Sequence, residues 1–133
     1  MMETSKRAEA GVEFKRKNNC AQAVMLAFQT EMGLDEENIK ALGSGFGSGM
    51  GGMEATCGAM CGAAMAAGLI NKSNTPTKML CKEMLQDFKA AAGATICGDL
   101  KGIKTGKMLF SCDDCVRQAV LVLEKRLEKL AEN

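Results

Sequence analysis

Residues 57–70 read CGAMCGAAMAAGLI and contain no charged residue, and the uncharged run extends from Ala55 to Asn71. A membrane-spanning helix needs about 20 consecutive apolar residues. This run is shorter and only weakly hydrophobic, so we expect a buried core helix. Its glycines and alanines leave two helical faces nearly bare, which lets a second helix approach closely. Because a glycine inside a helix costs about 1 kcal/mol relative to alanine, a packing or ligand requirement is expected to compensate. The alternative is a tight helix crossing without chemistry.

Helical patterns flank this stretch on both sides. Before it, residues 4–17, 19–32 and 35–42 carry helix-forming residues, with Asn18 or Asn19 as a cap and Gly33 where a helix ends. After it, residues 76–92 begin with Thr75 as the cap and Pro76 as the first helical residue, and Ser111 opens the last helix. The central helix is expected to start near residue 53. Residues 43–52 are glycine-rich and are expected to form a loop, and residues 94–110 are expected to be irregular.

The sequence predicts an all-α fold. No segment shows the alternation of β-branched residues that is typical of a strand. The 133 residues suit the size of one domain, and 47% of them are hydrophobic and 25% charged, as in folded globular proteins. We therefore expect a single cysteine-rich domain over residues 1–133, a compact bundle of about five or six helices with a Gly-rich loop.

Composition excludes several classes of function. The chain has 17 Lys and Arg against 16 Asp and Glu, a net charge of +1, so no strong field favours nucleic acid or an anionic membrane as a partner. It has no histidine, which excludes a histidine base and His-ligated zinc or haem. The first residues, MMETSKR, contain no apolar run, so no secretory signal is expected. The odd count of 7 cysteines argues against a complete disulfide framework, and a cytoplasmic location is expected.

Several of the cysteines lie near predicted helix starts. Cys20, Cys57 and Cys112 are in this position, where the partial positive charge of the helix terminus stabilises a thiolate. Cys57 is the strongest candidate for an acidic thiol, because two carboxylates directly follow Cys112 and oppose the helix terminus. Two further cysteines, Cys61 and Cys115, lie four and three residues after Cys57 and Cys112, so each pair shares a helical face.

Other features favour simpler explanations. Cys81 lies in an apolar helical pattern and is expected to be a buried core residue that no site requires. The methionines most simply fill a core that is short of aromatic residues. Met together with Cys could bind copper(I), but the sequence contains no compact run of Met-x-x-Met repeats that would favour it. Residues 47–52 match G-x-G-x-x-G, but no strand precedes them, so a tight connection is expected. Their amides could still surround an anion or the sulfides of a cluster.

The cysteine pattern as a whole resembles a known family. The matching elements are Asn19-Cys20-Ala-Gln-Ala-Val24, Gly51-Gly52, Cys57-Gly-Ala-x-x-Gly-Ala63, Cys97-Gly-Asp-Leu100 and Cys112-x-x-x-Val116. This order over nearly the whole chain resembles the C_GCAxxG_C_C family of redox-active proteins. One departure is that Thr56 precedes Cys57, where the family's title has glycine. The resemblance implies a redox role for Cys20, Cys57, Cys97 and Cys112 as redox thiols or metal ligands, and leaves Cys61, Cys81 and Cys115 at variable positions. A related domain of split-Soret cytochromes is associated with an iron-sulfur cluster, so both a cluster and a dithiol are implied.

Three functions compete at this point. The first is a redox or electron-transfer protein that works with an unidentified redox partner, in which the four cysteines hold an iron-sulfur cluster or cycle between dithiol and disulfide. The second is a structural zinc site of four cysteines. For a metal site of either kind, Cys61 and Cys115 are secondary candidate ligands. The third is a dimerising helical protein, because Val116, Val120, Leu123, Leu127 and Leu130 form an apolar stripe on the last helix. We favour the first, and expect a homodimer through the last helix.

Overall fold

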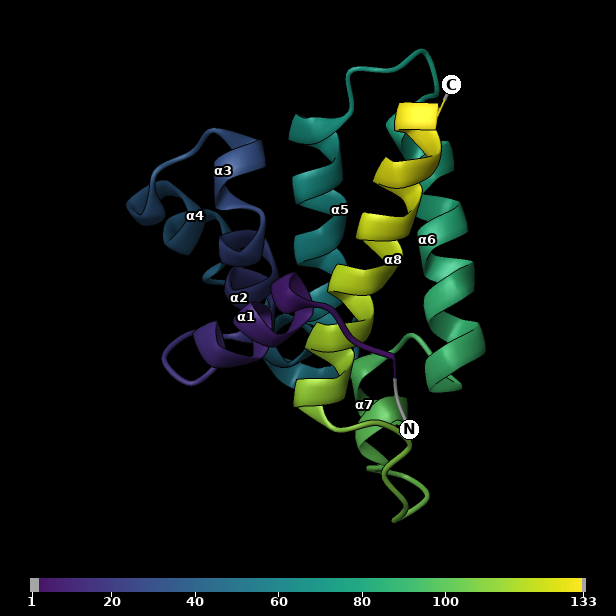
Figure 1. The fold of residues 1–133 in the computed structure, drawn as a ribbon. Coiled ribbons are helices and arrows are strands. Elements are labelled where there is room, and N and C mark those ends of the chain that lie inside the picture. The colour runs from purple at the N-terminus through teal and green to yellow at the C-terminus, as the bar shows by residue number, and fades with distance from the viewer. Residues whose placement is uncertain (1–2, 133) are drawn as a thin grey trace.

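The computed structural model describes residues 3–132, and nine helical segments lie within them (Figure 1). In chain order they are α1 (Lys6–Phe14), α2 (Cys20–Ala27), α3 (Gln29–Met32), α4 (Glu36–Gly43), η1 (Gly49–Met53), α5 (Gly58–Ile70), α6 (Thr77–Ala92), α7 (Cys97–Lys101) and α8 (Cys112–Glu132). The all-α prediction is confirmed. The expected number of five or six helices was too low.

Short breaks and turns account for the extra helices. The pattern over residues 19–32 is divided at Phe28, whose φ of −110° and ψ of 16° separate α2 from α3. The glycine-rich segment, expected to be a loop, contains the five-residue turn η1, with left-handed backbone at Met50. The segment over 94–110, expected to be irregular, contains the short helix α7. Each of these is only four or five residues long, too short to give a clear periodic pattern.

The uncharged stretch forms the central helix, α5. It starts at Gly58, later than expected, because the residues before it pair with the segment before α7 through an isolated antiparallel bridge between Thr56 and Ile96. Helix α5 contacts α2, α3, α6 and α8, and Figure 1 shows α5, α6 and α8 side by side, with α1 to α4 gathered on one side of them. Residues 59, 63, 66 and 67, all alanines, are completely buried. The prediction of a buried core helix is confirmed.

Gly62 explains how closely α2 and α5 approach. A Cβ atom at this position would lie 2.5 Å from the carbonyl oxygen of Ala21. Only glycine fits there, so the small residues of α5 bring the start of α2, which carries Cys20, against the start of α5.

The apolar stripe of the last helix packs mostly inside the chain itself. Val116, Val120 and Leu123 are completely buried, and α8 contacts α1, α2, α5 and α6. Leu127 and Leu130 are only partly buried against the same core.

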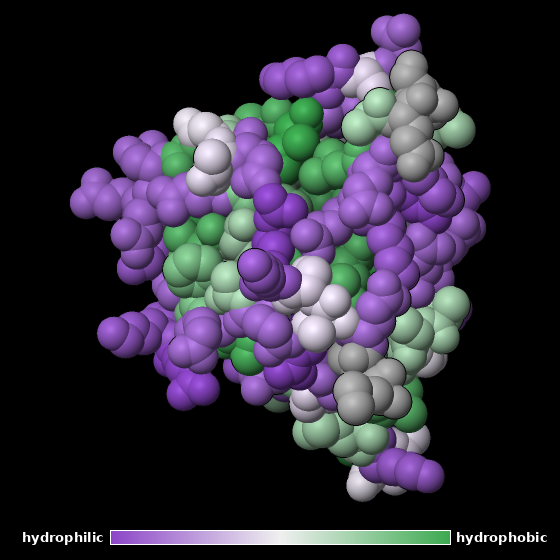
Figure 2. Space-filling model, in the orientation of Figure 1, coloured by the Kyte–Doolittle hydropathy of each residue, from purple (hydrophilic) through white to green (hydrophobic). Residues whose placement is uncertain are grey.

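Hydrophilic side chains cover most of the face in Figure 2, with apolar side chains visible between them. Among residues 3–132, no helix has both the length and the apolar character that crossing a membrane requires.

Candidate functional site

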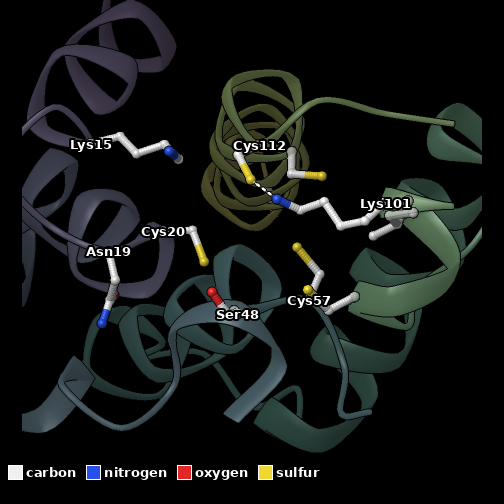
Figure 3. A pocket seen from close by; sticks show the side chains of 11 residues that line it. Lys15, Asn19, Cys20, Ser48, Cys57, Lys101 and Cys112 are labelled. Atoms are coloured by element: carbon white, nitrogen blue, oxygen red, sulfur yellow. Dashed lines mark hydrogen bonds between the residues drawn. The ribbon is translucent and has the colours of Figure 1, made fainter. Parts of the chain in front are cut away.

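Five cysteines line one cavity of about 110 Å³ at the end of the bundle where α5 and α8 begin, the lower end in Figure 1. Its walls comprise Cys20, Cys57, Cys97, Cys112 and Cys115, together with Lys15, Asn19, Ser48, Gly58, Leu100 and Lys101. Figure 3 shows the sulfurs of Cys20, Cys57 and Cys112 pointing toward the same space from three different helices. The four cysteines singled out in the sequence are therefore brought together, from segments as far apart as residues 20 and 112.

Each of these four cysteines stands at the beginning of a helix. Cys20, Cys97 and Cys112 are the first residues of α2, α7 and α8, and Cys57 is the N-cap of α5. The helix starts are fixed locally: the Asn19 side chain accepts from the Gln22 N–H, and the Ser111 hydroxyl oxygen accepts from the Asp114 N–H. The free N–H groups and partial positive charge of a helix start favour a thiolate. The sequence predicted this placement for three of the four and missed it for Cys97, because α7 was not expected.

The antiparallel bridge positions Cys57 and Cys97 relative to each other. The Cys57 N–H donates to the Thr95 carbonyl at 2.8 Å, and the Cys97 N–H donates to the Ala55 carbonyl at 3.0 Å. Each cysteine therefore follows the bridge pair by one residue. Because side chains alternate along an extended segment, both cysteines leave the same face of this short ribbon.

Two glycines provide the room that the sulfurs occupy. A Cβ atom at residue 58 would lie 2.5 Å from Cys20 Sγ and 2.5 Å from the Phe46 carbonyl oxygen. A Cβ atom at Gly49, where φ is +58°, would lie 2.6 Å from Cys97 Cβ. Ser48, from the Gly-rich segment, also lines the cavity, and its N–H partly offsets the rise in the pKa of Cys20 that burial causes.

Cys57 and Cys115 both line the cavity, and each thiol changes the pKa of the other. The neighbouring Cys115 thiol lowers the pKa of Cys57 to about 7, aided by the N–H groups of Ala59 and Met60 and by the charge of Lys101, against the opposing effect of burial. The nearby Cys57 thiol, together with burial, raises the pKa of Cys115. Burial raises the pKa values of Cys20 and Cys97 as well. Cys57 is thus the group of this pair that loses its proton first.

Lys101 brings a cation into the cavity. Its ammonium group donates a hydrogen bond to Cys112 Sγ, and this bond raises the pKa of Lys101 (Figure 3). Lys15 lines the cavity as well, from the end of α1. Lys101 was not expected from the sequence to belong to the site. Its spacing of four residues from Cys97 was the available signal, because it places both residues on one face of a short helix.

One protein-family model matches most of the chain, including all of the cavity cysteines. The model described as "Putative redox-active protein (C_GCAxxG_C_C)" matches residues 18–126, which include every cysteine of the chain. The chain belongs to the C_GCAxxG_C_C family. No curated protein and no solved structure gave a significant match.

The cysteines outside the C_GCAxxG_C_C pattern lie in two different places. Cys115 lines the cavity beside the family's four cysteines, whereas Cys61 and Cys81 do not. The Cys61 thiol lies 3.8 Å from the Thr56 carbonyl oxygen, to which it donates. Burial raises the pKa values of both Cys61 and Cys81. All seven cysteines are free thiols, and within residues 3–132 no three Cys, Asp or Glu side chains are placed to hold a single metal ion.

Proposed function

We propose that this member of the redox-active family is an electron-transfer protein whose cavity holds an iron-sulfur cluster through Cys20, Cys57, Cys97 and Cys112. The observation that carries the proposal is that the four family cysteines all begin helices and line one cavity. A dithiol requires only two sulfurs. Iron-sulfur clusters are typically held by four cysteine thiolates, which is the number that the pattern supplies.

The donor set of the cavity fits such a group. Thiolate ligands must lose their protons. At Cys57 the neighbouring Cys115 thiol, the N–H groups of Ala59 and Met60 and the charge of Lys101 favour this loss, whereas burial opposes it at Cys20 and Cys97. Metal binding therefore has to displace the protons of Cys20 and Cys97. Hydrogen bonds to the ligating sulfurs and charge near the cluster are the means by which proteins set a cluster's reduction potential. When bound, the cluster would supply one-electron transfer; the residues of the chain would hold it, limit its exposure and compensate its negative charge.

The second candidate function is thiol-disulfide exchange by Cys57 and Cys115, which is favoured by their position in one cavity wall and by the lowered pKa of Cys57. The Cys57 thiolate would attack a disulfide of a partner and form a mixed disulfide, and one partner sulfur would leave as a thiolate. Cys115 would then lose its proton and attack Cys57, forming the Cys57–Cys115 disulfide and releasing the partner as a dithiol. Two electrons pass from this chain to the partner in that sequence.

The deciding experiment is anaerobic purification, followed by reconstitution with ferrous iron and sulfide. We expect iron and acid-labile sulfide in the protein, charge-transfer absorption in the visible range, and an electron paramagnetic resonance signal in one oxidation state. Cys20→Ser should lose the cluster, whereas the matched control Cys81→Ser, outside the cavity, should keep it. A protein that binds zinc and no iron, or one that binds neither and forms a Cys57–Cys115 disulfide, would contradict the proposal.

The proposal has two further consequences. The electrons require a redox partner protein, which we expect to dock over the cavity, near Lys15 and Lys101. We propose a cytoplasmic location, because the odd count of 7 cysteines argues against a complete disulfide framework.

A further inference from the structure

A second cavity, of about 160 Å³, lies between α5 and α6 and is separate from the family's cysteine site. It is lined by Thr56, Met60, Cys61, Ala64, Cys81, Met84 and Leu85. Two thiols and two thioethers therefore surround one space. The proposed electron-transfer function uses none of these four side chains.

The two helices present these side chains from opposite walls. Cys81 and Met84 are three residues apart on α6 and share a helical face. Met60 and Cys61 are neighbours on α5, and Ala64, one turn further on, leaves the space open because its side chain is small. The thioethers are fixed by the core, since Met60 is 4% and Met84 0% exposed, whereas both thiols are only partly buried. An ion can therefore reach the thiols from solvent.

The metal-binding side chains of this cavity are soft sulfur ligands, two thiols and two thioethers. Among residues 3–132, no carboxylate, amide or amine side chain lines it, and Thr56 supplies the one side-chain hydroxyl. Such a lining lacks the several oxygen ligands that Mg²⁺ and Ca²⁺ require. Thiolate sulfurs suit copper(I), zinc and iron-sulfur clusters. Structural zinc sites use four Cys or His ligands, whereas this cavity offers two thiols and two thioethers, so copper(I) fits it better.

We propose that Cys61 and Cys81, assisted by the thioethers of Met60 and Met84, form a copper(I) site. On binding, two S–H bonds break, two Cu–S bonds form and two protons pass to solvent. Copper stays monovalent and nothing is oxidised. The site gives the protein a second function, the capture of copper(I), which does not depend on whether an iron-sulfur cluster occupies the first cavity.

The test is anaerobic alkylation of the reduced protein with and without copper(I), with mass mapping of each cysteine. Copper(I) should slow the alkylation of Cys61 and Cys81 together by about tenfold or more, because a metal-bound thiolate is no longer a free nucleophile. In Cys81→Ser, copper should no longer protect Cys61. In the matched control Cys20→Ser, which removes a thiol from the first cavity, both should remain protected.

Two further variants separate binding from damage to the fold. Met84→Leu keeps the size and hydrophobicity of the buried side chain. It should retain the helical circular dichroism but release copper to a copper(I) chelator such as bathocuproine disulfonate at a lower chelator concentration. The proposal is overturned if copper leaves Cys61 and Cys81 of the wild type as reactive as before, or if Cys61 stays protected in Cys81→Ser. The iron content of the reconstituted protein, measured separately, reports on the electron-transfer proposal alone.

Discussion

At the scale of single residues, replacing Lys101 should change the reduction potential of the proposed cluster without removing any of its cysteine ligands. Its ammonium group is in contact with Cys112 inside the cavity. Reduction adds negative charge, which a nearby cation stabilises, so Lys101 should raise the reduction potential of the proposed cluster. Lys101→Met should shift the reduction equilibrium about tenfold toward the oxidised state, equivalent to about 59 mV for one electron.

Redox titration of the reconstituted protein measures this shift. Lys101→Arg should restore most of the potential, because it keeps the charge. The control is Lys104→Met, which removes the same charge from an exposed position where solvent and salt screen it. Equal potentials in Lys101→Met and Lys104→Met would show that the cavity ammonium has no special role.

Cys57 should be the most acidic thiol of the metal-free, reduced protein. Because the Cys115 thiol and the start of α5 stabilise its thiolate, the pKa of Cys57 lies near 7, below the free value of about 8.5. Its alkylation rate should therefore fall by half as the pH drops to about 7. In Cys115→Ala, the loss of the donor should move this midpoint upward. Alkylation against pH with mass mapping measures both, and midpoints at or above the free value for every accessible cysteine would contradict the prediction.

At the scale of helices, the glycines of α5 have different roles that substitution should separate. Alanine at Gly58 would collide with Cys20 Sγ and with the Phe46 backbone, whereas nothing lies within 4 Å of a Cβ at Gly68. Gly58→Ala should therefore lower the free energy of unfolding by about 1–3 kcal/mol, as expected for overpacking. Gly68→Ala should raise it by about 0.4–1 kcal/mol, because alanine is the better helix former. Urea unfolding measures both changes, and a neutral Gly58→Ala would show that this close contact carries no cost.

The same helices show what the sequence could and could not predict. Burial of α5 followed from its uncharged composition, and the positions of Cys20 and Cys112 followed from the capping signals at Asn19 and Ser111. Cys57 was expected near a helix start, but that start was placed too early. The bridge between Thr56 and Ile96 joins segments 40 positions apart in the numbering, so no local pattern predicts it. The start of α5 and the existence of α7 both depend on that bridge. Lys101 was missed for the same reason, because its place in the cavity follows from α7.

At the scale of the whole molecule, a homodimer through the last helix stays a prediction, with a smaller surface than the sequence suggested. Val116, Val120 and Leu123 are already buried within the chain, so Leu127 and Leu130 are the apolar positions of the stripe that a partner copy could still cover. Light scattering should give a dimer mass for the wild type and a monomer mass for the double variant Leu127→Lys, Leu130→Lys. A monomer mass for the wild type at high concentration would contradict the dimer.

Removing a bound cluster should loosen the molecule as a whole, and its lower end most. The four family cysteines come from α2, α5, α7 and α8, so a group bound by all of them cross-links helices that are distant in the chain. A ligand that binds only the folded state adds its binding free energy to stability. Chelation of the iron should therefore lower the Tm.

Hydrogen exchange locates the change within the molecule. Helix α7 has five residues, and the segment that follows it is largely exposed, so α7 is held mainly by the backbone bridge of Cys97 to Ala55 and by the buried side chains of Cys97 and Leu100. On loss of the cluster, the Leu100 N–H, which donates to the Ile96 carbonyl, should lose more protection than amides in the middle of α5. The Cys81→Ser variant should show the same Tm loss on chelation as the wild type, because Cys81 lies outside the cavity. If the loaded and chelated proteins shared one Tm and one exchange pattern at α7, the four cysteines would not be joined by a common ligand.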